Sequence, residues 1–173
     1  MPRAFATRLA ALAIAAACSP AETQTFDAKT RALDGDTVAV DFRLLGVDAF
    51  ERRQLCQMAS GCWECGKAAQ DFSARALRDK TATIRLTPTS SYGRPVAIVT
   101  VDGADLGERL IRAGLAVPAT QYLRADPQRA SRYSAAFAQA KASRAGAFRG
   151  TWIDPSRWRG GERLACERRP SGR

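Results

Sequence analysis

The chain has 173 residues, enough for one domain with a substantial core, and a formal net charge of +10. It contains no histidine, which excludes every nuclease or protease mechanism that uses an imidazole and leaves a carboxylate as the natural base. The basic excess favours polyanionic partners such as nucleic acid, anionic lipid or acidic glycans, although a solvated arginine-rich surface explains it equally well.

The N-terminus has the pattern of an export signal. Arg3 and Arg8 form a basic region before a short apolar run over residues 9–17, and small residues follow the run. We therefore expect residues 1–21 to be a secretory signal peptide and the protein to be periplasmic or secreted. Cys18 follows three alanines, a weak form of a lipoprotein cleavage box, so a lipid anchor at Cys18 is the less favoured alternative.

Two strands are expected next, over residues 24–33 and 36–47, where Thr, Val, Phe and Leu partly alternate with other residues. Asp34-Gly35 between them is a hairpin turn signal. One face of the second strand is expected to be buried, because three apolar residues occupy alternate positions: Val38, Val40 and Phe42.

Residues 52–64 read as a polar loop that carries cysteines. Beyond the expected signal peptide the cysteines number four, and an even number in an exported protein favours disulfides. These are Cys56, Cys62, Cys65 and Cys166. Pairing Cys56 with Cys65 would close a short loop, and Cys62 with Cys166 would then pin the tail, but the sequence leaves three connectivities open. A zinc site of four thiolates is disfavoured, because only one CxxC half is present.

The rest of the chain alternates between helices and strands. A helix is expected over residues 66–80, where apolar residues recur at spacings of three and four, and strands over 81–87 and 95–101. Asp105 and Glu108 form a capping box at the start of a short helix that Gly114 ends. Asp126-Pro127 opens the last helix, which Gly146 stops.

These elements predict an α+β fold: a five-stranded β-barrel of the OB type with about three helices. We expect one such domain over residues 22–150, followed by an Arg/Trp-rich C-terminal tail over residues 151–173.

The most informative stretch, DGDTVAVDFRLLGVDAFE, covers residues 34–51. It contains three carboxylates of interest, Asp36, Asp48 and Glu51, together with Arg43, on two neighbouring β-type segments. Phosphodiester cleavage needs such a set: oxygen ligands for a divalent cation, a carboxylate that activates water and a guanidinium for the phosphate. Asp34, as the first residue of the turn, is assigned a structural role.

DGDT, RLLGVDAFE, YGR and GERLIRAGLA follow one another in an order that resembles the staphylococcal nuclease (thermonuclease) family, from about residue 25 to residue 150. The resemblance implies a Ca²⁺-dependent nuclease on an OB-fold barrel. We therefore expect an exported monomer that cleaves DNA and RNA with little sequence preference.

The resemblance also implies a metal site and a base. Asp36 and Asp48 resemble the carboxylate ligands of Ca²⁺, and Ala49 would add its backbone carbonyl. Glu51 resembles the residue that orients or deprotonates the attacking water.

Four further residues resemble substrate-binding positions of the family. Arg43 and Arg94 resemble the two arginines that bind the phosphate. Tyr92 is placed like a tyrosine near the nucleotide phosphate, and Tyr122 like an aromatic residue that packs on a base.

The chain departs from the family pattern at Phe50, where proline is usual. Proline would fix φ next to the ligand carbonyl, and phenylalanine loosens that constraint and leaves its ring free to enter or cover the site. The alternative function is therefore a catalytically inactive OB-fold module that binds nucleic acid. The complete set of charged residues favours the enzyme.

Overall fold

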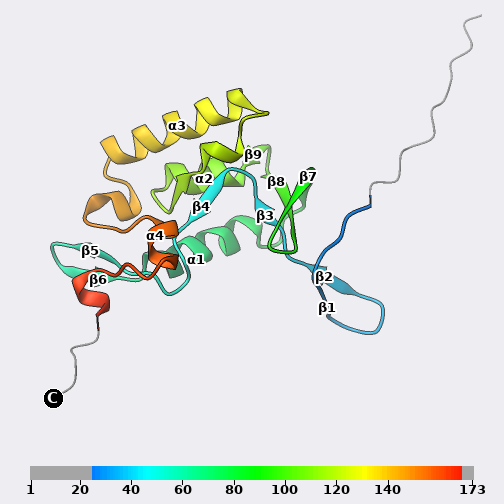
Figure 1. The fold of residues 1–173 in the computed structure, drawn as a ribbon, viewed down its shortest axis with the longest axis horizontal. Coiled ribbons are helices and arrows are strands. Elements are labelled where there is room, and N and C mark those ends of the chain that lie inside the picture. The colour runs from blue at the N-terminus through cyan, green and yellow to red at the C-terminus, as the bar shows by residue number, and fades with distance from the viewer. Residues whose placement is uncertain (1–24, 169–173) are drawn as a thin grey trace, which may run out of the picture.

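The computed structural model describes residues 25–168 (Figure 1). The expected signal peptide and Cys18 lie outside the described residues. Within this part of the chain, no helix has the length and apolar character needed to cross a membrane.

The first element is a hairpin that projects from the rest of the molecule (Figure 1). Its strands β1 (Thr30–Ala32) and β2 (Val38–Val40) pair antiparallel. The hairpin expected at Asp34-Gly35 is therefore confirmed. The expected burial of Val38 is wrong, since its exposed fraction is 65% and no other sheet of the described residues pairs with this hairpin.

A four-stranded sheet lies at the centre: β3 (Arg43–Leu44), β7 (Ala82–Ser91), β8 (Arg94–Val101) and β9 (Ala104–Asp105). β8 pairs antiparallel with β7 and β9 and parallel with β3. Two further pairs stand apart from this sheet: β4 (Val47–Ala49) with β10 (Ala116–Pro118), and β5 (Cys56–Met58) with β6 (Gly61–Trp63).

The α+β class is thus confirmed, but the strands of residues 25–168 do not close into a five-stranded barrel. The reason is the separation of the strand pairs. Among the described strands, β1 and β2 pair only with each other, and β4 pairs with β10 instead of with the central sheet.

The three helices expected from the sequence are present: α1 (Cys65–Leu77), α2 (Leu106–Arg112) and α3 (Pro127–Ala142). Side-chain caps fix the starts of α2 and α3. The Asp105 carboxylate accepts from the Glu108 amide at 3.1 Å, and the Asp126 carboxylate accepts from the Arg129 amide at 2.9 Å. Single-turn 3₁₀ segments follow at Thr120–Tyr122, Gly146–Arg149 and Ala165–Glu167.

The main core lies between the central sheet and the three helices. Val101, Leu110 and Ile111 are fully buried in it. Tyr133 joins them, and its hydroxyl donates to Asp105 at 2.8 Å. Burial raises the pKa of the Tyr133 hydroxyl above its ordinary value, so the neutral donor form is favoured. Apolar burial of this kind is the main force that holds α2 and α3 against the sheet.

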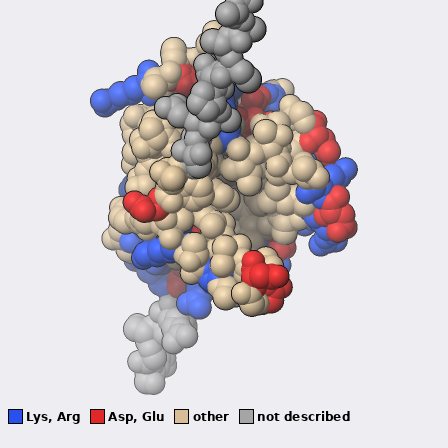
Figure 2. Space-filling view, turned by 90° about the vertical axis from the view of Figure 1, so that its right-hand side faces the viewer, with Lys and Arg blue, Asp and Glu red and all other residues tan. Residues whose placement is uncertain are grey.

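Charge is distributed over the surface in both signs. On the face shown in Figure 2, basic and acidic side chains are interspersed, and no patch of one sign covers it. The net charge of +10 therefore does not mark a single basic surface on this face.

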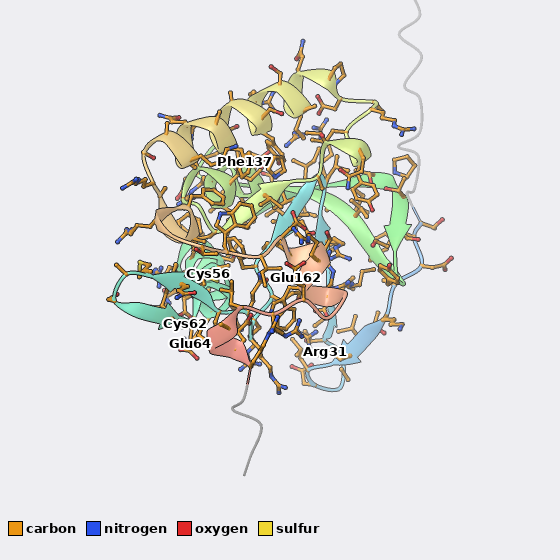
Figure 3. The ribbon with its side chains drawn as sticks, turned by 60° about the vertical axis from the view of Figure 1, so that its left-hand side comes forward. Arg31, Cys56, Cys62, Glu64, Phe137 and Glu162 are labelled. Atoms are coloured by element: carbon orange, nitrogen blue, oxygen red, sulfur yellow. A yellow bond between two sulfur atoms is a disulfide. The ribbon has the colours of Figure 1, made fainter. Side chains whose placement is uncertain are left out.

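The C-terminal segment packs against the β5–β6 hairpin (Figure 3). Gln57 and Thr151 exchange backbone hydrogen bonds of 2.8 and 2.9 Å. Disulfides join Cys56 to Cys65 and Cys62 to Cys166. The expectation of disulfides is confirmed and the zinc alternative is wrong, because all four sulfur atoms are already paired.

One helix was not expected from the sequence: α4 (Pro155–Arg159) in the tail. Asp154 caps it by accepting from the Ser156 amide at 2.9 Å, and a buried proline occupies the first helical position. This short helix lies beside β4 (Figure 1), and Arg159 is its last residue.

Candidate functional site

Asp48 and Glu51 lie together at the end of β4. Asp48 is the middle residue of that strand and pairs with Val117 of β10. Glu51 follows the strand, and the exposed fraction of its side chain is 34%, against 16% for Asp48. Both carboxylates are therefore accessible from the surface while their backbone is fixed by the fold.

The Arg159 guanidinium bridges the two carboxylates. It contacts both oxygens of Asp48 at 2.8 Å in a forked arrangement and one oxygen of Glu51 at 2.7 Å. The hydrogen bond to Asp48, followed by that to Glu51, raises the pKa of Arg159 above its ordinary value despite partial burial. The site therefore holds a permanent positive charge that no sequence pattern indicated.

Gln54 fixes the backbone of Glu51. Its side-chain oxygen accepts from the backbone amide of Glu51 at 3.1 Å, and its backbone N–H donates to the Glu51 carbonyl at 2.7 Å. Its side-chain nitrogen donates to the Ile153 carbonyl at 2.6 Å. Gln54 is fully buried. It thus links the Glu51 loop to the tail. This role could not be predicted from the sequence, because a single Gln in a polar loop belongs to no motif.

The start of α1 packs directly against the loop that carries Glu51. A Cβ on Gly66 would lie 1.6 Å from the Glu51 carbonyl oxygen, so only glycine fits there. The Gly66 amide also donates to the Gln54 carbonyl at 3.1 Å.

Phe50 points into the core. Its exposed fraction is 3%, and its ring packs against Phe148 and Trp152 at centroid distances of 6.4 and 5.8 Å. The ring therefore does not cover the carboxylates, and it anchors β4 to the segment that leads into the tail.

Arg43 and Arg94 lie at one end of the central sheet. Arg43 is opposite Val96 on β8, two residues from Arg94, and strand alternation puts both arginines on one face. Arg43 donates to the Ser91 hydroxyl at 3.3 Å. Among the described residues neither arginine has a carboxylate partner.

Two tyrosines of the predicted site are prominent on the surface. Tyr92 and Gly93 form the two-residue turn between β7 and β8, both with positive φ (53° and 73°), as a type I′ turn requires. The exposed fraction is 86% for Tyr92 and 70% for Tyr122. Both rings are free to contact a ligand.

Asp36 lies in the exposed β1–β2 turn. There the Asp34 carboxylate accepts from the Asp36 amide at 3.3 Å, which fits the turn role expected for Asp34. A hydrogen bond from the Thr37 side chain lowers the pKa of the Asp34 carboxyl. No three acidic, Cys or His side chains within residues 25–168 are gathered as a metal site. The structure therefore brings Asp48 and Glu51 together but does not add Asp36.

A family model described as Staphylococcal nuclease homologue matches residues 41–150, more than half of the chain. The chain belongs to the staphylococcal nuclease family. A search of the curated proteins finds no match. The family is generally one of phosphodiester hydrolases that act on nucleic acids. Asp48, Glu51 and both candidate arginines lie inside the matched residues of this nuclease homologue, whereas Asp36 and Arg159 lie outside them.

Staphylococcal nuclease homologues are typically Ca²⁺-dependent, and the chemistry of the acidic pair fits a hard cation. The oxygens of Asp48 and Glu51 already converge on one cationic group, the Arg159 guanidinium, at 2.7–2.8 Å. The pair is thus arranged to share a positive charge, and Arg159 supplies it here.

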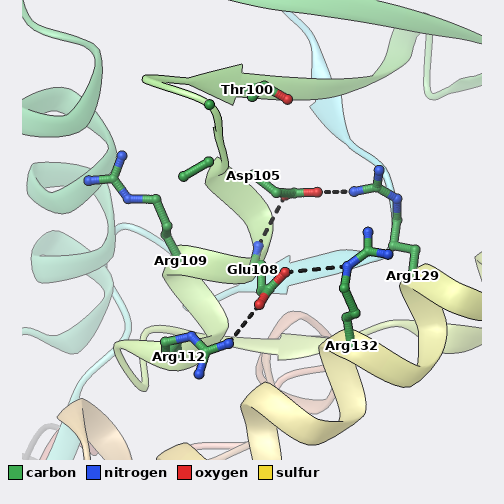
Figure 4. Close-up of a pocket in the computed structure, with 9 residues that line it drawn as sticks. Thr100, Asp105, Glu108, Arg109, Arg112, Arg129 and Arg132 are labelled. Carbon is green, nitrogen blue, oxygen red and sulfur yellow. Dashed lines mark hydrogen bonds and ion pairs between the residues drawn. The ribbon is translucent and has the colours of Figure 1, made fainter.

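The protein also has a cleft of about 430 Å³ between β9, α2 and α3 (Figure 4). Within it, Glu108 accepts from Arg112 at 2.6 Å and lies 3.6 Å from Arg132, while Arg129 binds Asp105. These charges are mutually satisfied and join α2 to α3. None of the residues predicted for the site lines this cleft, so we assign the candidate site to the β4 carboxylates.

Proposed function

We propose that the protein is an exported, Ca²⁺-dependent nuclease that hydrolyses phosphodiester bonds of DNA and RNA with little sequence preference. The observation that carries the proposal is the juxtaposition of Asp48 and Glu51, at the surface and inside the segment that matches the nuclease family.

Glu51 is proposed as the general base. Its carboxylate accepts the proton of the water that attacks the phosphorus, a role that falls to a carboxylate in a chain without histidine. Gln54 binds the backbone amide of Glu51, and the start of α1 packs against its carbonyl, so both support the position of the base. A fixed base lowers the entropic cost of reaching the reactive geometry.

Arg43 and Arg94 are proposed to bind the phosphate. Both present guanidinium groups at one end of the sheet without a carboxylate partner among the described residues. Forked hydrogen bonds to phosphate oxygens strengthen as negative charge accumulates on them in the transition state.

Asp48 and the Ala49 carbonyl are proposed to hold Ca²⁺, together with Asp36, which a movement of the β1–β2 turn would have to bring to them. When bound, the ion supplies polarisation of the phosphoryl oxygen and offsets the charge that develops there. Hard oxygen donors of this kind suit Ca²⁺.

The low sequence preference follows from the kind of contacts available. Phosphate contacts carry no sequence information, and the exposed rings of Tyr92 and Tyr122 offer stacking surfaces that any base can use. We propose that the protein works as a monomer. Two disulfides fit its proposed export, because such bonds persist in oxidising compartments.

The test is a Glu51→Gln variant, assayed for cleavage of fluorescent single-stranded DNA at saturating Ca²⁺. Removing the base is expected to lower the cleavage rate by about 10²- to 10⁴-fold. Glu64→Gln is the matched control, since Glu64 is exposed and close in the chain, and its rate is expected to be unchanged.

An inactive nucleic-acid-binding module is the second candidate, favoured by the neutralisation of the acidic pair by Arg159. In that case the wild-type protein binds DNA without cleaving it, and Glu51→Gln leaves the affinity intact. Unchanged cleavage in Glu51→Gln would instead show that the base is another residue.

A further inference from the structure

We propose that Arg159 is an internal cation that competes with the divalent metal ion for Asp48 and Glu51, so that the Arg159 side chain must release the carboxylates before the metal binds. This inference rests on the proposed function, which assigns Asp48 to the metal and Glu51 to the attacking water.

The competition follows from the atoms that Arg159 occupies. Its two terminal nitrogens engage both oxygens of Asp48 and one oxygen of Glu51. Ca²⁺ needs ligand oxygens at about 2.3–2.6 Å, and its approach to this pair is opposed by the positive guanidinium already in contact. The two cations therefore exclude one another.

The tail delivers Arg159 to this position from two anchors. Before α4, the Ile153 carbonyl accepts from buried Gln54 at 2.6 Å. After α4, the Cys62–Cys166 disulfide ties the chain to β6. A group held on a short tethered segment has a high effective concentration at its target, so the contact re-forms readily after each release.

Glu167 strengthens the second anchor. Its carboxylate accepts from the Leu55 amide at 3.0 Å, from the Trp158 indole at 2.8 Å and from the Leu164 amide at 3.0 Å. Trp158 precedes Arg159, so this carboxylate fixes the turn of helix that presents the guanidinium. These three hydrogen bonds to one side chain hold the C-terminal tail in a single position against the β5–β6 hairpin.

Release of Arg159 needs no opening of the core. The exposed fraction of its side chain is 39%, so the guanidinium lies at the surface. A change of its side-chain rotamer, or a small shift of the end of α4, frees the carboxylates while both anchors stay in place.

The experiment is a Ca²⁺ titration by isothermal calorimetry of the disulfide-bonded protein, wild type against Arg159→Ala. The variant is expected to bind Ca²⁺ at least tenfold more tightly. Arg157→Ala is the matched control, since Arg157 lies on the same helix and pairs with Glu162 at the surface, and its affinity should equal that of the wild type. Equal or weaker binding by Arg159→Ala, or no Ca²⁺ binding by either protein, overturns the proposal.

A second measurement uses the wild-type protein alone. The side-chain Nε–H resonance of Arg159, assigned by triple-resonance connection to the backbone amide of the same residue, should shift when Ca²⁺ saturates the site. A resonance that stays in place while Ca²⁺ binds overturns the proposal even if the variant folds poorly.

Cleavage of single-stranded DNA by the same preparations separates this inference from the proposed function. Tighter Ca²⁺ binding by Arg159→Ala without any cleavage supports the competition and contradicts the nuclease. Ca²⁺-dependent cleavage with equal affinities in both proteins supports the nuclease and contradicts the competition.

Discussion

At Asp48 and Glu51, two like charges are held close to each other and need a cation nearby. Arg159 meets that need with short, charge-assisted hydrogen bonds, of which the two to Asp48 are forked. Partial exposure keeps the energetic value of these ion pairs modest, since solvent screens them. The contact is therefore specific in geometry and still open to exchange with another cation.

Gln54 is the residue whose removal tests the support of the site. We expect Gln54→Ala to lower the free energy of unfolding by about 1–3 kcal/mol, because it leaves the Ile153 carbonyl and the Glu51 amide without their partner. The measurement is urea unfolding followed by tryptophan fluorescence. Gln57→Ala is the control, since the exposed Gln57 bonds through its backbone. Equal stability of the two variants would show that the buried amide does not hold this loop.

The acidic pair could be identified from the sequence, but Arg159 could not. Asp48 and Glu51 belong to one short motif, while Arg159 is 111 residues beyond Asp48, in an arginine-rich stretch without a periodic pattern. An ion pair between such distant residues depends on tertiary packing and leaves no local signal. The same reason explains why the buried state of Gln54 was missed.

At the scale of elements, α1 and the Glu51 loop depend on one close approach. We expect Gly66→Ala to destabilise the protein by about 1–3 kcal/mol, because the new Cβ would force the Glu51 carbonyl aside. The measurement is the urea midpoint, together with the DNA cleavage rate, which should also fall. Gly35→Ala, which meets nothing within 4 Å, is the control. A Gly66→Ala protein as stable as the control would contradict this packing.

The elements that the sequence predicted well are those with local chemistry at their ends. The capping carboxylates of Asp105 and Asp126 fix the starts of α2 and α3. In contrast, α4 is too short to show a helical period in its sequence. The strands β5 and β6 lie in the segment expected to be a loop, and the Cys56–Cys65 disulfide ties β5 to the start of α1. The OB-type barrel was expected from the number and order of the strands and from the family resemblance, neither of which determines which strands of this chain pair.

At the scale of the whole molecule, the segment that matches the nuclease family and the tail that follows it meet at the acidic pair. The matched residues supply Asp48 and Glu51, and the tail supplies their cation from α4, held by the Cys62–Cys166 disulfide. The protein therefore carries its candidate catalytic carboxylates and a residue that neutralises them on one disulfide-linked chain. Both the carboxylates and the arginine that neutralises them are expected to affect metal-dependent cleavage.

The most direct measurement of the central claim is cleavage of single-stranded DNA by the purified, disulfide-bonded protein, first with excess Ca²⁺ and then with a Ca²⁺ chelator. We expect cleavage in the first condition and its loss in the second, because the acidic pair then lacks the ion that offsets charge on the phosphate. No cleavage in either condition by a folded protein, or cleavage that survives the chelator, would contradict the account.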